Sequence, residues 1–260
     1  MNNAIHFVLD LETMSTAPNA AIAAIGCVRV QQGEIIDEFY ERVDLESSRA
    51  MGGEIDTPTL QWWLKQSREA RQEVSGELAS LPITTALGKL TEFMHRSGLS
   101  DDQPLVWGNG SSFDNVILGT AYQRAGIPMP WKFWNDRDLR TLLALHPHVK
   151  QAITFEGTKH HALHDARHEA RQLIAAIEAH AAVTAERDAA NSRLHEVAVA
   201  CTEAEQERDQ LRAEVEALRK DAERYRWIKE CEPEEIDIVI ENPGDDLDSA
   251  IDDAMAARET

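Results

Sequence analysis

Hydrophobic residues in the first part of the chain cluster in three segments joined by turns, as is typical of β-strands. The segments span residues 5–12, 20–30 and 33–43. The last of them contains EIIDEFYERV, in which hydrophobic and polar residues alternate with the period of two of a strand. The pattern predicts three strands that form the antiparallel start of a sheet.

Beyond residue 56 the spacing of apolar residues becomes helical. Thr57 and Pro58 predict a helix start, with the threonine as the cap and the proline in the first turn. The other predicted elements are helices over 84–97 and 112–125, strands at 105–108 and near 131–134, a helix from about Asp136, and a long helix from His160. Strands followed by helices indicate an α/β fold with a mixed sheet flanked by helices.

From about residue 180 to residue 228, proline and glycine are absent and alanine, glutamate and arginine dominate. Apolar or small residues then recur in alternating steps of three and four, with Arg208 at the one polar position: Leu194, Val197, Cys201, Ala204, Leu211, Val215, Leu218, Ala222 and Tyr225. This heptad pattern predicts a coiled coil and a homodimer, or a helix that folds back on its own domain. We therefore divide the chain into a domain at 1–180, a coiled-coil helix at 181–228 and an acidic C-terminal segment at 229–260.

Composition narrows the class of protein. The net charge is −20, and more than half of the excess lies in the last 31 residues, so the rest of the chain is only mildly acidic. The chain lacks the basic surface of a tight duplex binder. No apolar run approaches about 18 residues, so we expect no membrane span. The N-terminus has no signal-peptide pattern, and Cys27, Cys201 and Cys231 lie far apart, which favours a cytoplasmic protein over a zinc or disulfide framework.

The candidate chemistry begins with Asp10 and Glu12 in the first predicted strand, FVLDLET. Residues two apart in a strand point the same way, so the two carboxylates lie side by side. The apolar neighbours of this pair indicate a central strand rather than a solvated strand face. Adjacent buried carboxylates repel each other unless a cation neutralises them, and a hard divalent cation with oxygen ligands does this.

Two further patches carry acidic residues. Asp114 follows the loop WGNGSSF at the start of a predicted helix, where a structural role at the helix N-terminus is the alternative to metal binding. Asp165 lies in HHALHDARHEA, after three histidines. His161 is one helical turn before Asp165, so helical geometry alone favours it as the partner of Asp165, whereas His160 precedes the helix. A histidine here titrates near neutral pH and suits general base catalysis.

The order of these patches resembles the DEDD superfamily of 3′-to-5′ exonucleases, in its histidine branch, over roughly residues 5–180. DLETM, NAAIAAIG, WGNGSSFDN and WKFWNDRDLRT together are similar to the phage and prophage type, which is related to ribonuclease T-like exoribonucleases. The resemblance implies a ribonuclease H-like fold. It also implies two Mg²⁺ or Mn²⁺ ions held by Asp10, Glu12, Asp114 and Asp165. The superfamily motif places four residues between histidine and aspartate, which selects His160 as the base.

The expected activity is the release of nucleoside 5′-monophosphates from single-stranded or overhanging 3′ ends of DNA or RNA, in the bacterial host cytoplasm if the gene is carried by a phage. The substrate contacts that we predict are Met14, Trp62, Trp63, Asn109 and Ser112. One of the two tryptophans belongs to the core on this interpretation, and the other stacks on a base. The alternatives are a catalytically inactive nucleic-acid-binding module of the same fold, or a coiled-coil interaction protein.

Overall fold

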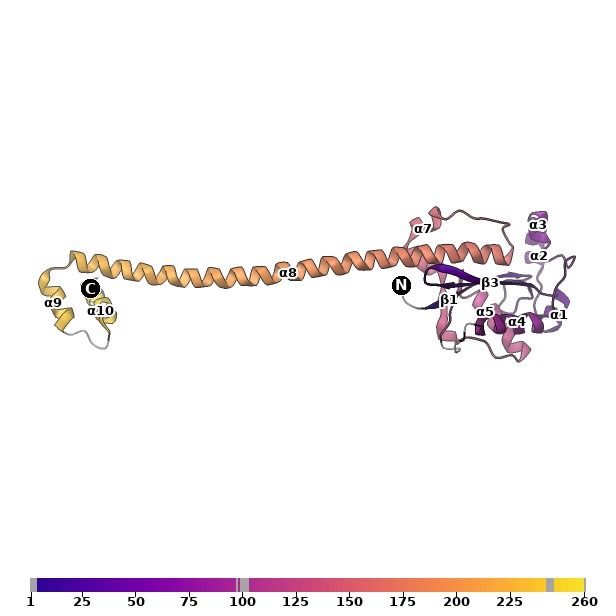
Figure 1. The fold of residues 1–260 in the computed structure, drawn as a ribbon, viewed down its shortest axis with the longest axis horizontal. Helices are drawn as coiled ribbons and strands as arrows, with labels where there is room; N and C mark the ends of the chain where they lie inside the picture. Colours follow the sequence, from indigo (N-terminus) through magenta and orange to yellow (C-terminus); the bar gives the residue numbers. More distant parts are fainter. Residues whose placement is uncertain (1–3, 97, 99–102, 242–245, 260) are drawn as a thin grey trace. The chain divides into compact units, whose positions relative to one another are not determined.

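The computed structural model describes residues 4–96, 98, 103–241 and 246–259. The chain divides into two compact units, Met1–Ala185 and Glu186–Thr260. The first unit contains a five-stranded sheet in the order β3-β2-β1-β4-β5 (Figure 1). Its strands are β1 (Ile5–Thr13), β2 (Ile22–Gln31), β3 (Glu34–Arg42), β4 (Leu105–Gly108) and β5 (Asp136–Asp138). Strands β1, β2 and β3 pair antiparallel, whereas β4 and β5 add in parallel, so the prediction of a mixed sheet is confirmed.

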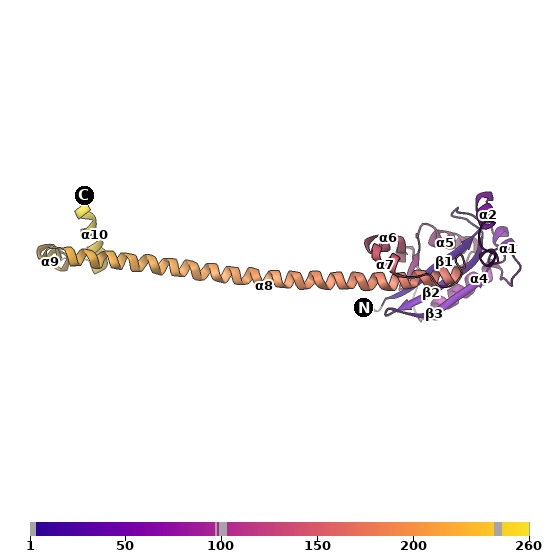
Figure 2. The same cartoon turned by 90° about the horizontal axis from the view of Figure 1, so that it is seen from above.

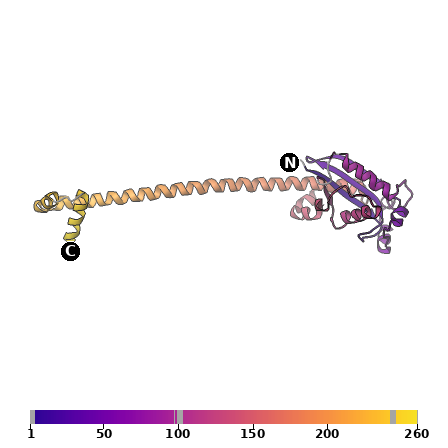
Figure 3. The ribbon, with the colours of Figure 1, turned by 90° about the horizontal axis from the view of Figure 1, so that it is seen from below.

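Helices cover both faces of this sheet (Figures 2 and 3). In the first unit they are α1 (Leu45–Ala50), α2 (Thr57–Trp63), α3 (Arg68–Arg71), α4 (Ile83–His95), α5 (Asp114–Ala125), α6 (Leu139–Leu145), α7 (Pro147–Ala152) and the first part of α8 (Ala162–Glu230). Phe7 and Leu9 of β1 face one apolar core with α4 and α5, and Val8 faces a second core with α6, α7 and α8. Asp10 and Glu12 share the side of Val8, so they point toward α8.

The start of α2 differs in detail from the prediction. Asp56, not Thr57, is the N-cap, and its carboxylate accepts a hydrogen bond of 2.7 Å from the backbone N–H of Thr59. Thr57 is the first helical residue, followed by Pro58. An aspartate and a threonine are both good caps, and the sequence pattern alone did not distinguish them.

The predicted strand near 131–134 is wrong. Residues Phe133–Asn135 form a short 3-10 helix, strand β5 follows at Asp136–Asp138, and α6 begins at Leu139 with Asp138 as its cap. The aromatic run was misleading because Phe133 and Trp134 are exposed rather than packed in a sheet. Trp131 is buried, and its Nε1–H donates to the carboxylate of Asp136 at 2.8 Å.

Gly26 determines how closely α8 approaches the sheet. It lies in β2 directly opposite Asp10 of β1. A Cβ atom at this position would lie only 2.2 Å from the backbone oxygen of Ala162, the first residue of α8. The helix start therefore rests on bare backbone beside Asp10, which brings Asp165 in the first turn of α8 toward the same place.

The second unit consists of the remainder of α8, which is one continuous helix to Glu230, and the helices α9 (Pro233–Glu241) and α10 (Leu247–Glu259). The predicted helix over 181–228 is thus confirmed as a helix, and its pairing as a coiled coil stays a prediction. Val239 and Ile251 are buried in this unit. Within the described part of the chain, each helix is too short or too polar to span a lipid bilayer.

Candidate active site

A cavity of about 610 Å³ opens beside the C-terminal half of β1. Seven of the residues that the sequence singled out line it: Asp10, Glu12, Trp62, Trp63, Asn109, His160 and Asp165. They come from the sheet, α2, the loop after β4, and the start of α8. Segments far apart in the sequence therefore meet at one polar cavity.

Asp10 and Glu12 supply the carboxylates of β1. Glu12 is buried, and Asp10 is partly exposed to the cavity. Burial raises the pKa of Asp10 well above its usual range, and the nearby carboxylates of Glu12 and Glu169 raise it further. Burial also raises the pKa of Glu12 well above its usual range, and the charge of Asp165 raises it further. Both groups therefore favour a neutralising cation or a proton.

Asp114 is the first residue of α5 and is buried beside β1. Its Oδ1 accepts a hydrogen bond of 3.2 Å from the backbone N–H of Leu11, between the two carboxylates of β1. Burial raises the pKa of Asp114 to about 7, although this hydrogen bond favours the ionised form. A Cβ atom at Gly108 would lie 3.2 Å from the Asp114 carboxylate and 2.6 Å from Oδ1 of Asn115. The glycine thus allows α5 to start close to the end of β4.

The two adjacent histidines point to different places. His160 lines the cavity, and its ring nitrogen together with carboxylate oxygens of Glu12 and Asp165 forms a group of potential ligand atoms within 4.8 Å of one another. His160 has a φ of 62°, a left-handed backbone that is uncommon outside glycine. His161 donates its backbone N–H to the Asp165 carboxylate at 3.1 Å, and its side chain points away to Glu73. Burial raises the pKa of Asp165.

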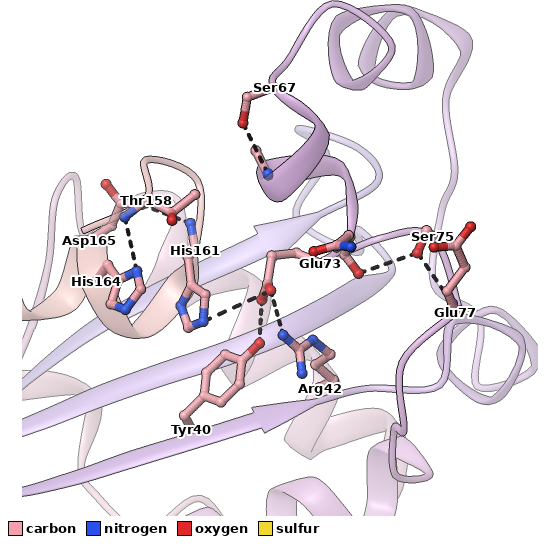
Figure 4. A network of polar contacts seen from close by, with 12 residues as sticks. Tyr40, Arg42, Ser67, Glu73, Ser75, Glu77, Thr158, His161, His164 and Asp165 are labelled. Carbon is pink, nitrogen blue, oxygen red and sulfur yellow. Dashed lines mark hydrogen bonds and ion pairs between the residues drawn. The ribbon is translucent and has the colours of Figure 1, made fainter.

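Glu73 is the centre of a buried polar network behind this loop (Figure 4). Its carboxylate accepts hydrogen bonds from the Tyr40 hydroxyl and from Arg42 Nη2, the latter at 2.7 Å. The ring of His161 stacks on Tyr40 on one side and on His164 on the other, at centroid distances of 4.5 and 4.0 Å. The edge strand β3 thereby holds the segment that carries His160. No pattern in the sequence indicated Glu73, because it lies in a short polar connection after α3.

Glu169 is a further carboxylate of the site that the sequence reasoning missed. It is buried and lines the cavity, and its Oε2 has no hydrogen-bond partner among the residues that the structure describes. Burial raises the pKa of Glu169 well above its usual range, and the charge of Asp114 raises it further. A hydrogen bond with Asn109 opposes this shift. Glu169 lies one helical turn after Asp165 on α8, so the spacing of four could have identified it.

The candidate substrate contacts divide into two groups. Trp63 is 3% exposed and donates its Nε1–H to the backbone oxygen of Thr13 at 2.9 Å, so it braces the fold while lining the cavity. Trp62 is 42% exposed and meets His160 edge to face at 4.8 Å. Met14 lies in a small buried apolar cluster with Trp63, and Ser112 is exposed on the turn before α5. The cavity thus gathers Trp62, Trp63 and Asn109, whereas Met14 and Ser112 lie apart from its lining.

The donor set fits divalent cations. Asp10, Glu12, Asp165 and Glu169 line one cavity, and Asp114 is buried next to β1. Oxygen ligands of this kind suit Mg²⁺ or Mn²⁺, and the unpartnered oxygen of Glu169 provides a free lone pair. Burial and, after it, mutual repulsion raise the pKa of several of these groups, and a cation among them would relieve the repulsion.

Solved structures with similarity to this chain include exonuclease I of E. coli in complex with a dT13 oligonucleotide, at 14% identity and a TM-score of 0.46, covering 67% of this chain and 40% of that one. A product-bound exonuclease I has 13% identity and a TM-score of 0.44, covering 68% and 43%. This chain thus spans about two fifths of the length of the exonuclease I structures.

Two comparisons of sequence bear on the family. The chain is 28% identical to the exodeoxyribonuclease of Enterobacteria phage T4, over 52% of this chain and 69% of that protein. Residues 5–177 match the family profile described as the 3′-5′ exoribonuclease Rv2179c-like domain. This match includes the whole of the sheet and every residue of the acidic cavity. The chain belongs to this family, which is one of 3′-5′ exonucleases.

Proposed function

We propose that the chain is a metal-dependent 3′-to-5′ exonuclease that removes nucleoside 5′-monophosphates from single-stranded or overhanging ends. The observation that carries the proposal is the convergence of Glu12, His160 and Asp165 in one cavity, beside Asp10 and Asp114. The membership of this chain in an exonuclease family supports the same reaction.

The carboxylates of Asp10, Glu12, Asp114 and Asp165 would hold two Mg²⁺ or Mn²⁺ ions. When bound, such ions supply a more acidic water and stabilise charge on the leaving oxygen. Asp114 is fixed by the N–H of Leu11, and Asp165 by the N–H of His161, so backbone hydrogen bonds orient both carboxylates before substrate arrives.

His160 would accept the proton of the attacking water at its ring nitrogen. A ring nitrogen of His160 lies within 4.8 Å of carboxylate oxygens of Glu12 and Asp165, at the edge of the acidic cluster. The imidazole contacts Trp62 edge to face, which limits its rotation. A neutral histidine is a suitable base near pH 7, because its ordinary pKa lies close to that value.

Trp62 and Asn109 would contact the terminal nucleotide. Trp62 is an exposed aromatic side chain at the cavity, and stacking on a base does not depend strongly on base identity. Asn109 offers an amide beside Glu169. We therefore expect cleavage with broad sequence tolerance. The family description names RNA and the phage T4 relative is named for DNA, so both sugars belong in the test.

The test is degradation of uniformly labelled RNA, single-stranded DNA and duplexes with 3′ tails, in Mg²⁺, Mn²⁺ or EDTA. We expect stepwise shortening and mononucleotide products with metal, and intact substrate in EDTA. His160→Ala should reduce turnover by about 10²-fold or more, the typical contribution of a general base, while Mn²⁺ binding measured by calorimetry persists. Absence of mononucleotides from every substrate, or an unaffected His160→Ala variant, would overturn the proposal.

A further inference from the structure

The part of α8 that lies in the second unit carries an exposed apolar stripe. Six large apolar residues on it are between 49% and 68% exposed: Leu194, Val197, Leu211, Val215, Leu218 and Tyr225. Four smaller or polar residues complete the stripe: Cys201, Ala204, Arg208 and Ala222. All ten together recur in alternating steps of three and four residues along one side of the helix. A long stripe of this kind exposed to water indicates a surface that a partner covers.

The spacing assigns heptad positions along the stripe. Leu194, Cys201, Arg208, Val215 and Ala222 occupy position a, and Val197, Ala204, Leu211, Leu218 and Tyr225 occupy position d. A strict repeat of this kind forms the narrow seam of a coiled coil rather than the wide face of a helix that packs on a domain. The partner is therefore another helix with the same repeat.

The positions beside the seam identify that partner by charge. The g positions of three successive heptads are acidic, Glu207, Glu214 and Asp221, and the e positions that follow are basic, Arg212, Arg219 and Arg226. In a parallel pair in register, each g residue faces the e residue of the next heptad in the other helix. A second copy of this chain therefore gives Glu207–Arg212, Glu214–Arg219 and Asp221–Arg226 pairs, on both sides of the seam.

An antiparallel pair does not fit these charges. In that arrangement g positions face g positions and e positions face e positions, so acidic residues such as Glu207 and Glu214 would oppose one another. The arginines at 212 and 219 would oppose one another as well. Like charges held together along a seam disfavour an assembly.

The C-terminal helices leave the seam open. Arg224, which is at position c, pairs with Asp248 at 2.8 Å and with Asp252, so α10 packs on a different side of α8. Leu218 and Tyr225 on the seam stay 60% and 68% exposed beside this contact. The contact of α10 thus occupies one side of α8 and leaves the seam free for a second copy.

We propose that residues 194–225 pair with the same residues of a second copy as a parallel, in-register, two-stranded coiled coil. Arg208 at position a and the small residues Ala204 and Ala222 weaken the seam. A polar residue at one a position is a known means of specifying register at a cost in stability. The proposal does not depend on the nuclease activity, and its tests measure association alone.

The first test is an exchange of charges in the full chain, with the mass in solution measured by light scattering. One variant carries Glu207→Arg and Glu214→Arg, and the other carries Arg212→Glu and Arg219→Glu. Each variant should lose affinity for itself by on the order of a hundredfold, because attractive pairs become repulsive on both sides of the seam. An equimolar mixture of the two should dimerise again, since every g position then faces an opposite charge.

The second test reads the orientation through Cys201, which is exposed at position a. In a parallel pair in register the two Cys201 side chains face each other across the seam. In an antiparallel pair they would be roughly 25 Å apart along the helix axis. Mild oxidation of the full chain should give a covalent dimer that disappears in Cys201→Ser and persists in Cys231→Ser.

Three outcomes would overturn the proposal. The first is a wild-type chain that stays monomeric at about 100 μM, a concentration at which a pair with a Kd near 10 μM would be mostly dimeric. The second is a pair of charge variants that each remain as dimeric as the wild type, which would place the interface on another surface. The third is a chain that is dimeric in solution and yet forms no disulfide through Cys201 on mild oxidation, which would exclude the parallel register.

Discussion

The Nε2 atom of His161 lies 3.9 Å from a carboxylate oxygen of Glu73, at the centre of the network behind the cavity. This contact joins the connection after α3 to the segment just before α8, and the Tyr40 ring supports it by stacking. The next residue toward the N-terminus is His160, which has an unusual left-handed backbone. The network therefore fixes the backbone that presents His160 to the cavity.

Glu73→Gln should lower kcat by roughly tenfold while KM changes little, because loss of a supporting hydrogen-bond partner typically costs 10–100-fold in activity. The carboxylate does not line the cavity, so substrate binding should persist. Tyr40→Phe keeps the stacked ring and removes only the hydroxyl, and we expect a smaller loss. Single-turnover kinetics on a labelled strand measure both. A Glu73→Gln protein that unfolds at a lower temperature but keeps the wild-type kcat below that temperature would contradict a positioning role.

Trp62 and Trp63 should respond differently to alanine. Trp62→Ala should raise KM by about 5–100-fold, since stacking on a base is worth about 1–3 kcal/mol, and should leave the folded state nearly unchanged. Trp63→Ala removes a side chain that is 3% exposed, and should lower the free energy of unfolding by about 3–5 kcal/mol. Denaturant unfolding and steady-state kinetics on the same preparations measure both effects. A purely stabilising role for Trp62 would show as normal KM in a destabilised Trp62→Ala protein.

Glu169→Gln should weaken Mn²⁺ binding by about tenfold in calorimetry, because it removes a negative charge from the acidic cavity without changing its shape. The matched control is Glu178→Gln, an exposed glutamate on the same helix. We expect this control to bind Mn²⁺ like the wild type. Identical Mn²⁺ affinities for the two variants would show that Glu169 does not contribute to cation binding.

Crowded carboxylates should make the metal-free protein sensitive to pH. The folded-state pKa of Asp114 is about 7, against an ordinary value of 3.8, so the folded state binds more protons than the unfolded state between these values. The stability associated with Asp114 is therefore present below about pH 4 and is lost as the pH rises through about 7. In EDTA, Asp114→Asn should match the wild type at pH 4 and exceed its free energy of unfolding by a few kcal/mol at pH 8. Thermal unfolding across this range measures the difference, and a constant difference at all pH values would contradict the prediction.

The sheet could be predicted from the sequence because its strands obey simple rules. β1 and β2 are runs rich in apolar residues between turns, β3 alternates apolar and polar residues, and the predicted bounds of all three agree with the structure to within two residues. The Asp10 and Glu12 pair was predicted to share one side of a strand, and both residues line the cavity. The position of β5 was wrong because the aromatic residues Phe133 and Trp134 are exposed instead of forming the strand.

Parts of the site that depend on tertiary contacts could not be predicted. Glu73 has no neighbour in sequence that indicates burial, and its partners Tyr40 and His161 are far away along the chain. The choice between His160 and His161 depended on resemblance to a superfamily, because helical spacing alone favoured His161. The left-handed backbone at His160 explains why, since the helix begins only at Ala162. Glu169 was the exception, because its spacing from Asp165 was visible in the sequence.

Gly26 makes the site vulnerable at a position that bears no functional group. Any side chain there would overlap the backbone of Ala162 and move the first turn of α8, which carries Asp165, away from β1. A screen of random mutations for inactive but folded proteins should therefore recover substitutions at Gly26 as well as at the acidic residues. The size of the new side chain would then set how far Asp165 is displaced from Asp10 and Glu12, the candidate metal ligands of β1. The geometry of the site can thus be adjusted in steps from a residue outside the lining of the cavity.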